Sequence, residues 1–524
     1  MSEDNKNHPL ADLLEKGQGT AIIGDLGTLT YSDLRLMVSN IGEQLASLGI
    51  GSGDAVGIVT PNGPEAATVF LSIASFATAA PLNPSYTKDE FKFYLEDLSA
   101  KILIVTEDGN RNAIAAATEL GIKVLAMRLK KLPGDFSLTL NGEKLKQSPA
   151  EKNLHNDISL VLHTSGTTSR PKIVPLTSDN ISVSARNISR TLKLTDQDLY
   201  LNIMPLFHIH GLIAGVLATL ESGGSMFCST GFDALKFFSL VDDLKPTWFS
   251  AVPTMHQAIL SRAERNKTII ENSRLKFIRS SSASLPVAVL KELETVFNCP
   301  VIEAYGMTEA AHQMTSNPLP PLKRKPGTVG LPAGPVVEIL TSDGEILGPN
   351  QIGEIAIKGA NVTKGYQNNP KANNENFTDG WFRTGDQGQK DEEGFLTIKG
   401  RLKEIINRGG EKISPKEIDE VLLQHSNISQ AVTFAIAHKK LGEDIGAAVV
   451  LVDPAKTNET DIKEFLKVQL ANFKIPRRIV FLDEIPKGST GKIQRIGLAE
   501  KLGLIKGRYV LLEPEQLAVI LQSN

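Results

Sequence analysis

The stretch ISLVLHTSGTTSRPK, Ile158 to Lys172, joins an apolar run to a turn rich in hydroxyl-bearing residues and ends on a lysine. The apolar half predicts a buried strand, since short runs of this kind bounded by turn residues are typical of parallel sheets. Backbone N–H groups and hydroxyls gathered in one turn form a nest for phosphate oxygens, with Lys172 as the counter-charge. A solvated Ser/Thr turn is the alternative interpretation. The stretch lacks the GxxxxGK[ST] pattern, which disfavours a P-loop kinase or NTPase.

Strand and helix patterns alternate over most of the chain. Apolar, β-branched runs at 55–60, 101–106 and 123–127 predict further strands, and the segments 64–75 and 286–297 have helical periodicity. This alternation predicts an α/β fold, in which helices cover a parallel sheet.

The pattern changes toward the C-terminus. From about 326 to 400, short strands are separated by Gly and Asp turns, which predicts a small antiparallel β subdomain. After GRLKE (400–404) a new pattern begins, with a predicted helix at 415–425. We therefore expect a large N-terminal domain over 1–400 and a small α+β domain over 401–524.

Charge and composition exclude several classes of protein. The 524 residues carry 56 Lys and Arg against 59 Asp and Glu, interspersed without a basic tail, so nucleic acid is not expected as a partner. The two cysteines, Cys228 and Cys299, cannot form a disulfide framework, and no apolar run is long enough for a membrane span. The ends, MSEDNKNH and LQSN, match neither a signal peptide nor the Ser-Lys-Leu peroxisomal signal. We expect a cytoplasmic protein.

Five ordered motifs resemble those of the adenylate-forming acyl-CoA synthetase superfamily, and the resemblance covers essentially the whole chain. They are the Thr/Ser/Gly loop at 164–172, YGMTE (305–309), WFRTGD (381–386), GRLKEIINRGGEKISPKEID (400–419) and PKGSTGKIQR (486–495). The resemblance implies a mobile C-terminal domain and a two-step reaction. A carboxylate and ATP would give an acyl-adenylate and pyrophosphate, and the thiol of coenzyme A would then displace AMP.

The resemblance assigns the ATP site. The residues implied to hold the β- and γ-phosphates are Thr164, Ser165, Gly166, Thr167, Thr168 and Lys172. Thr308 would contact the α-phosphate and Glu309 would hold Mg²⁺, although this pair could also be a helix N-cap. Such a site suits the chemistry, because an ionised carboxylate needs charge neutralisation and alignment to attack phosphorus, and needs no general base.

The nucleoside would be held by residues from three motifs. Tyr305, followed by Gly306, would lie at the adenine, with a core tyrosine as the alternative interpretation. Asp386 and Arg401 would contact the ribose hydroxyls, although an Asp after a Gly is often only a turn residue.

The C-terminal motifs imply a change of state. Lys492 would bridge the substrate carboxylate and the α-phosphate during adenylation, whereas a lysine in a Gly/Ser loop is otherwise a surface charge. Lys403 matches the hinge about which the small domain would rotate. Gly409, Gly410 and Lys412 would then reach the active site from the coenzyme A side, although Lys412 could be an ordinary exposed lysine. His208 resembles a residue beside the coenzyme A tunnel.

One departure from the common motif concerns the substrate. Ser169 stands where the phosphate loop usually has its last glycine, and this wording, together with NRGGEKISP, is similar to the oxalate-CoA ligase branch. By position, the acyl pocket receives polar residues, namely His210, Arg279, Ser280, Ser281, Ser282, His312 and Gln313. An apolar acyl tail would leave such groups unpaired, so a small polar acid fits better, and oxalate is the preferred substrate. The histidines could instead be hydrogen-bonded core residues.

The sequence leaves three other functions open. A 4-coumarate- or medium-chain-acyl-CoA ligase and a luciferase-like oxygenase both need an apolar or aromatic pocket, which these polar residues disfavour. A nucleotide-binding scaffold without activity is opposed by the joint presence of Glu309, Asp386, Arg401 and Lys492.

Overall fold

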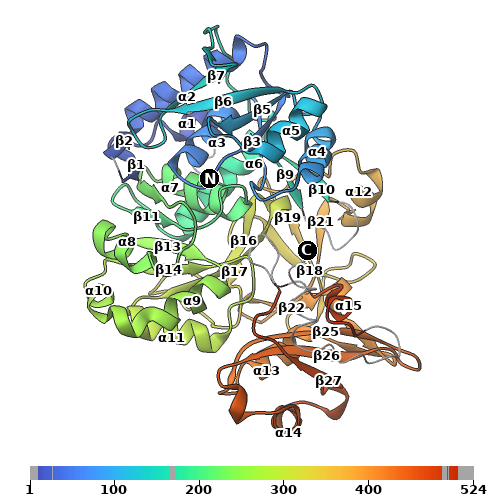
Figure 1. Cartoon of the computed structure of the whole chain (residues 1–524). Coiled ribbons are helices and arrows are strands. Elements are labelled where there is room, and N and C mark those ends of the chain that lie inside the picture. The colour runs from blue at the N-terminus through green and yellow to red at the C-terminus, as the bar shows by residue number, and fades with distance from the viewer. Residues whose placement is uncertain (1–9, 26, 165–170, 487–492, 494, 505–524) are drawn as a thin grey trace. The chain divides into compact units, whose positions relative to one another are not determined.

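The computed structural model describes residues 10–25, 27–164, 171–486, 493 and 495–504 (Figure 1). The chain divides into two compact units. The first contains Met1–Val337 and Ile357–Phe382, and the second contains Glu338–Ala356 and Arg383–Asn524. The domain division at residue 400 and the hinge at Lys403 stay predictions.

An eight-stranded sheet of the first unit contains the strand that leads to the phosphate loop. Its parallel centre consists of β9 (Ile158–Thr164), β4 (Thr78–Pro81), β3 (Ala55–Val59), β5 (Ile102–Thr106) and β6 (Lys123–Leu129). Antiparallel strands complete its edges, namely β10 (Lys172–Thr177), β7 (Phe136–Leu140) and β8 (Glu143–Lys144). The strands predicted from apolar runs are thus confirmed.

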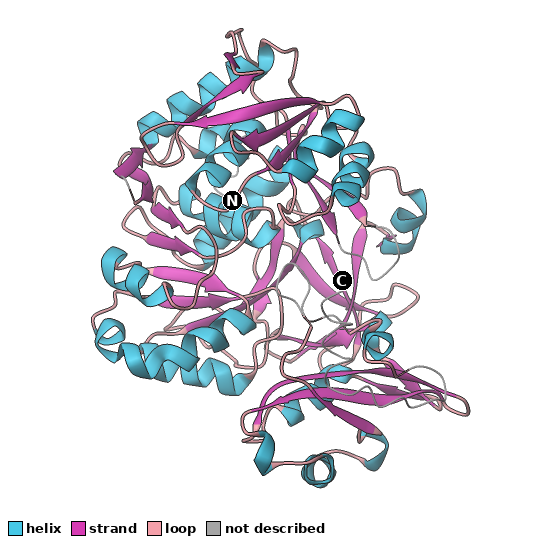
Figure 2. Cartoon of the chain, in the orientation of Figure 1, coloured by secondary structure: helices cyan, strands magenta, loops and turns pink. Residues whose placement is uncertain are grey.

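Helices cover this sheet, as Figure 2 shows. The helices packed on it are α2 (Tyr31–Ala46), α3 (Pro64–Phe76), α4 (Lys88–Asp97), α5 (Arg111–Glu119) and α6 (Ser178–Thr191). Two short helices, α1 (Leu10–Leu13) and α7 (Ala218–Glu221), pack on α6 instead. The predicted helix at 64–75 is α3, which links the parallel strands β3 and β4 and is buried from Ala66 to Phe76. Its nearly uniform apolar composition follows from packing on all sides.

A second sheet of nine strands supplies most of the candidate site. In spatial order it consists of β17 (Leu331–Pro332), β16 (His312–Ser316), β15 (Val301–Met307), β14 (Phe277–Ser280), β13 (Trp248–Ala251), β11 (Leu199–Asn202), β12 (Ser225–Cys228), β1 (Thr20–Gly24) and β2 (Gly27–Thr30). On one face, an apolar core joins the sheet to α8 (Phe237–Leu244), α9 (Pro253–Ala263), α10 (Lys267–Glu271) and α11 (Val287–Phe297). The helix predicted at 286–297 is α11.

The predicted antiparallel subdomain is also confirmed. A five-stranded sheet contains β18 (Val336–Leu340), β19 (Gly353–Lys358), β20 (Phe377–Thr378), β21 (Trp381–Lys390) and β22 (Leu396–Arg401). The short helix α12 (Pro370–Asn376) precedes β20.

The C-terminal part of the second unit has an α+β arrangement, in which helices cover both faces of a five-stranded sheet. Its strands are β23 (Ile406–Arg408), β24 (Glu411–Ile413), β25 (Ile428–His438), β26 (Gly442–Leu451) and β27 (Arg478–Phe481). Alternate residues of β25 and β26 enter different apolar clusters, because side chains along a strand point to opposite faces. One face packs on α13 (Pro415–Leu422) and α14 (Glu459–Gln469), and the other on α15 (Leu498–Lys501). The predicted helix at 415–425 is therefore present as α13.

Over the ranges that the structure describes, no helix is both long and apolar enough to cross a membrane. Cys228 and Cys299 are buried free thiols.

We expect the buried His256 to make the first unit sensitive to acid. The side chain lies on α9 and is fully buried, and burial lowers its pKa from 6.5 to about 4. Between these values the unfolded chain binds a proton that the folded chain does not, so stability falls as the pH is lowered. The loss from this group between pH 7 and pH 5 is about 2 kcal/mol.

The measurement is the urea midpoint at both pH values, followed by tryptophan fluorescence, to which the buried Trp248 of β13 contributes. His256→Gln should lose about 2 kcal/mol less than the wild type on acidification. Equal losses in the two proteins would contradict this assignment.

Candidate active site

The candidate residues of the first unit gather where parallel strands end. β11, β13, β14 and β15 are mutually parallel neighbours. Arg279 and Ser280 close β14, and Tyr305 and Gly306 lie near the end of β15. The carboxyl ends of parallel strands are where ligands bind in open α/β sheets.

The phosphate loop is held at both of its described ends. Thr164 is the last residue of β9, Lys172 is the first of β10, and the two are directly paired in antiparallel register. Four of the predicted phosphate contacts, Ser165, Gly166, Thr167 and Thr168, lie outside the described residues.

A chain of three side chains links Lys172 to the predicted metal ligand. The Lys172 ammonium lies 4.4 Å from the centre of the Tyr366 ring, a cation–π contact. The Tyr366 hydroxyl donates a hydrogen bond of 2.8 Å to Oε1 of Glu309. Burial, and then the charge of Glu309, raise the pKa of Tyr366 well above its ordinary range, so the phenol keeps its proton. Tyr366 was not predicted, because no spacing pattern links it to Glu309, 57 residues earlier.

Glu309 fits a magnesium ion bound mainly through substrate phosphates. Its carboxylate is buried, and the Tyr366 hydroxyl fixes one of its oxygens. In the described part of the chain, no group of three or more His, Cys, Asp or Glu residues could form an all-protein metal cage. Mg²⁺ commonly binds through one or two carboxylates together with phosphates and water, so a single buried glutamate suits it.

A tight turn presents Thr308 and Glu309. Thr308 begins a 3₁₀ helix, η3 (Thr308–Ala310), and Met307 holds the N-cap position without a side-chain cap, so the N-cap alternative for Thr308 is not met. Asn361 fixes the far side of the turn, because its amide donates to the carbonyl oxygens of Ala310 at 2.8 Å and Gln313 at 3.0 Å.

Four of the predicted pocket residues lie together. His210 begins an eight-residue π-helix, η1 (His210–Leu217), a rare conformation that often marks functional sites. Its Nδ1 lies 3.0 Å from the Ser282 hydroxyl. Its ring is 5.0 Å, centre to centre, from that of His312. Its Nε2 lies 3.5 Å from Nη1 of Arg279.

Two further residues join this cluster. Ser250 of β13 places its hydroxyl 2.6 Å from Nε2 of His210, and Gln313 of β16 accepts a hydrogen bond of 3.3 Å from Arg279. Gln313 was predicted beside His312, whereas Ser250 was not predicted to line the pocket. The signal for Ser250 is its position, since it directly precedes the last residue of β13.

Arg279 is a buried cation with neutral neighbours. Its side chain is fully buried, and burial lowers its pKa to about 10, which still leaves it charged at neutral pH. Among the residues that the structure describes, no carboxylate lies within ion-pair distance of it, and its Nε makes no hydrogen bond there. Buried charges are usually paired, so this guanidinium is suited to an anionic ligand.

The remaining predicted pocket residues differ in their hydrogen bonds. The Ser280 hydroxyl is buried and has no hydrogen-bond partner among the described residues. The Ser281 hydroxyl instead donates to the carbonyl of Ala304 at 2.9 Å, which gives it a structural contact. His208 is half-buried, and its Nδ1 accepts a hydrogen bond of 3.3 Å from the backbone of His210.

In the second unit, the two predicted ribose contacts form a cross-strand pair. Asp386 of β21 lies directly opposite Arg401 of β22, with 3.3 Å between Oδ1 and Nε. Asp386 is buried, whereas half of the Arg401 side chain is exposed. Two adjacent polar groups, one of each charge, can together bind a diol.

The other predicted residues of this unit lie in turns. Lys403 is exposed in the 3₁₀ turn η4 (Leu402–Glu404). Gly409 and Gly410 form the two-residue connection between β23 and β24, with φ of +61° and +99° that suit glycine. Lys412 is exposed on β24. Lys492 lies outside the described residues.

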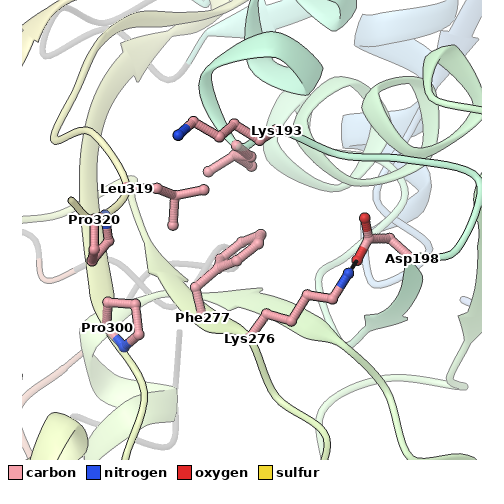
Figure 3. A pocket seen from close by; sticks show the side chains of 8 residues that line it. Lys193, Asp198, Lys276, Phe277, Pro300, Leu319 and Pro320 are labelled. Carbon is pink, nitrogen blue, oxygen red and sulfur yellow. Dashed lines mark hydrogen bonds and ion pairs between the residues drawn. The ribbon is translucent and has the colours of Figure 1, made fainter. Parts of the chain in front are cut away.

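A separate hollow of about 390 Å³ lies at the opposite ends of the same strands (Figure 3). Asp198, Lys276 and Pro300 line it, and each directly precedes one of β11, β14 and β15. Lys276 and Asp198 form an ion pair of 2.7 Å there. None of the predicted site residues lines this hollow, so we do not assign it to the active site.

Comparison with known proteins decides the family. Residues 13–367 match the AMP-binding enzyme family, and residues 417–492 match the AMP-binding enzyme C-terminal domain. The chain belongs to the AMP-binding enzymes. The oxalate–CoA ligase of Arabidopsis thaliana is 46% identical over 475 residues, which are 89% of this chain and 92% of that protein. The oxalate–CoA ligase of Saccharomyces cerevisiae is 42% identical over 504 residues, covering 90% and 92% respectively.

Solved structures of AMP-binding enzymes share the fold. The o-succinylbenzoate coenzyme A synthetase MenE from Bacillus subtilis, in complex with ATP and a magnesium ion, is similar with a TM-score of 0.79 and 27% identity. The match covers 93% of this chain and 98% of that one. An AMP-binding enzyme is thus known to hold ATP and Mg²⁺ in this fold.

We expect Gly306→Ala to disrupt the turn that carries Thr308 and Glu309. A Cβ at Gly306 would lie 1.7 Å from the carbonyl oxygen of His312, so β15 and β16 would have to separate. Overpacking of this kind costs about 1–3 kcal/mol, and the thermal unfolding temperature should fall. Gly51→Ala is the control, since no heavy atom lies within 4 Å of its Cβ. Equal unfolding temperatures for the two variants would contradict the prediction.

Proposed function

We propose that the chain is an ATP-dependent acid–CoA ligase that activates oxalate through an acyl-adenylate and releases AMP and pyrophosphate. The observation that carries this proposal is the buried guanidinium of Arg279, which has no carboxylate partner among the described residues. Oxalate is a dianion at neutral pH, so one carboxylate can pair with Arg279 while the other reacts. The two relatives named above as oxalate–CoA ligases support the same substrate.

The first step forms the adenylate. A carboxylate oxygen attacks the α-phosphorus of ATP, a new P–O bond forms, and the bond to the bridging oxygen of pyrophosphate breaks. No base is needed, because the acid is already ionised at neutral pH. Lys172, with Thr164 and Thr308, neutralises and orients the phosphates. Lys492 bridges the carboxylate and the α-phosphate.

Glu309 holds Mg²⁺ in this proposal, and the Tyr366 hydroxyl keeps the carboxylate in place. The ion, when bound, neutralises charge on the phosphates. The nucleoside is held by Tyr305 and Gly306 at the adenine and by Asp386 and Arg401 at the ribose.

The second step transfers the acyl group. The sulfur of coenzyme A attacks the acyl carbon, a C–S bond forms, and the bond to the AMP oxygen breaks. Rotation about Lys403 moves domain 401–524 relative to 1–400 between the two steps. Gly409, Gly410 and Lys412 then serve the coenzyme A side together with His208. A cytoplasmic location and the lack of a nucleic-acid partner stay predictions.

The pocket opposes the alternative substrates. A 4-coumarate- or medium-chain-acyl-CoA ligase, or a luciferase-like oxygenase, would place an apolar group against Arg279 and His210. Arg279 is already fully buried without a carboxylate partner among the described residues, so an apolar group would leave that cost of several kcal/mol in place, whereas a second carboxylate on the substrate would offset it. A scaffold without activity leaves the buried Glu309 and Arg279 unexplained.

The substrate is tested by AMP release from the purified protein with ATP, Mg²⁺ and coenzyme A. The acids compared are oxalate, malonate, acetate, octanoate and 4-coumarate. We expect kcat/KM for oxalate to exceed every other by about a hundredfold, or about 2.7 kcal/mol. A higher kcat/KM for octanoate or 4-coumarate than for oxalate would keep the reaction class but reject the assignment of the pocket.

Arg279→Met tests the charge directly. We expect kcat/KM for oxalate to fall about thirtyfold to a thousandfold, while the low activity on acetate stays within threefold, because only oxalate has a second carboxylate. Arg262→Met is the matched control, since Arg262 lies on α9 and, among the described residues, its side chain hydrogen-bonds only to the exposed hydroxyl of Ser261. Equal losses on oxalate and acetate would show that Arg279 only maintains the fold.

A further inference from the structure

Arg495, the last residue of the PKGSTGKIQR motif, is held by three elements of the second unit. Its Nε lies 3.1 Å from Oε2 of Glu404, and its Nη1 lies 2.6 Å from Oδ2 of Asp419. The same Nη1 donates a hydrogen bond of 3.1 Å to the carbonyl of Thr433. The guanidinium therefore links the turn η4, the helix α13 and the strand β25.

The network is built around a charge that the protein keeps. Burial lowers the pKa of Arg495, but Asp419 and Glu404 more than offset this effect and raise it. Asp419 is itself buried, and its Oδ1 accepts a hydrogen bond of 2.6 Å from the backbone of Thr433. A planar guanidinium can serve two carboxylates and a carbonyl at once, which an ammonium cannot do in the same geometry.

The position of Arg495 in the sequence indicates that its ion pairs have a role beyond stability. Lys492 lies three residues earlier, and Ile493, the residue between them that the structure describes, packs on the apolar cluster that includes Phe434 and Leu498. Ile493 and Arg495 are thus both anchored in the second unit, the first by apolar contact and the second by ion pairs. Glu404, the partner in η4, is the direct neighbour of Lys403.

We propose that Arg495 is a positioning residue for adenylation, which fixes the chain next to Lys492 and ties it, through Glu404, to the turn at Lys403. The inference rests on the proposed function, because it uses the adenylation role of Lys492. It predicts a defect in one half-reaction only. Adenylation needs Lys492 in place, whereas thioester formation does not use it.

The test separates the two half-reactions in the full-length enzyme, with the acid that the wild type prefers. Adenylation is followed as pyrophosphate release in a single turnover without coenzyme A. Thioester formation is followed after prolonged incubation has loaded the enzyme with adenylate, by adding coenzyme A. Thermal unfolding of each variant is recorded alongside.

For Arg495→Ala we expect adenylation to slow about a hundredfold, with KM for ATP changed less than threefold. Thioester formation should stay within threefold, the pattern also expected for Lys492→Ala. Arg495→Lys should adenylate about tenfold faster than Arg495→Ala, since one carboxylate can still be paired. Glu404→Gln should slow adenylation several-fold, because it removes the link to the turn at Lys403 and leaves Asp419 paired.

Arg478→Ala is the matched control, since Arg478 pairs with Glu459 at 3.8 Å elsewhere in the same unit. Both of its half-reactions should stay within twofold of the wild type. Equal losses in both half-reactions of Arg495→Ala, or unchanged adenylation, would overturn the proposal. If the wild type itself released pyrophosphate with none of the acids, the proposed function would fail and the inference with it, and this result would be visible before any variant is compared.

Discussion

Four parallel strands that end at one edge are the constraint on which the predicted pocket depends. β11, β13, β14 and β15 run side by side in one direction, so residues from distant segments meet where the strands stop. Arg279, Ser250 and His210 come from three different segments and are within hydrogen-bond distance of one another. The antiparallel strand β16, which pairs with β15, adds His312 and Gln313. The chemistry of the pocket is therefore a consequence of strand order.

The charge at the centre of this pocket affects the protein as well as its ligand. A fully buried guanidinium whose partners among the described residues are His, Ser and Gln is costly in the free protein. A dianionic ligand would remove that cost on binding, so part of its affinity would come from relief of the free state. This is the common conflict in which a functional site lowers the stability of the fold that carries it.

Sequence patterns predicted the elements well and the contacts only in part. Apolar runs located β3, β5 and β9, because burial on both faces of a parallel strand leaves a direct trace in composition. They also located β6, in which only the alternate residues Leu125 and Met127 are buried. Motif spacing brought Asp386 and Arg401 into consideration, and the structure pairs them across two strands. Tyr366 could not be found this way, since its link to Glu309 depends on how a loop returns to the turn. The hydroxyl of Ser281 was expected in the pocket but donates to the backbone of Ala304. Motif spacing does not reveal this contact either.

The pairing of Thr164 with Lys172 also bears on how such an enzyme can change over evolutionary time. The register of β9 and β10 is set by further pairs behind this one, from His163 with Ile173 to Ile158 with Thr177. An insertion or deletion between Thr164 and Lys172 would leave those pairs intact, and the lysine would stay opposite the threonine. The alignment of β9 with β10 therefore does not depend on the length of the loop between them. The predicted phosphate-binding segment can therefore change in length without moving the two residues that flank it.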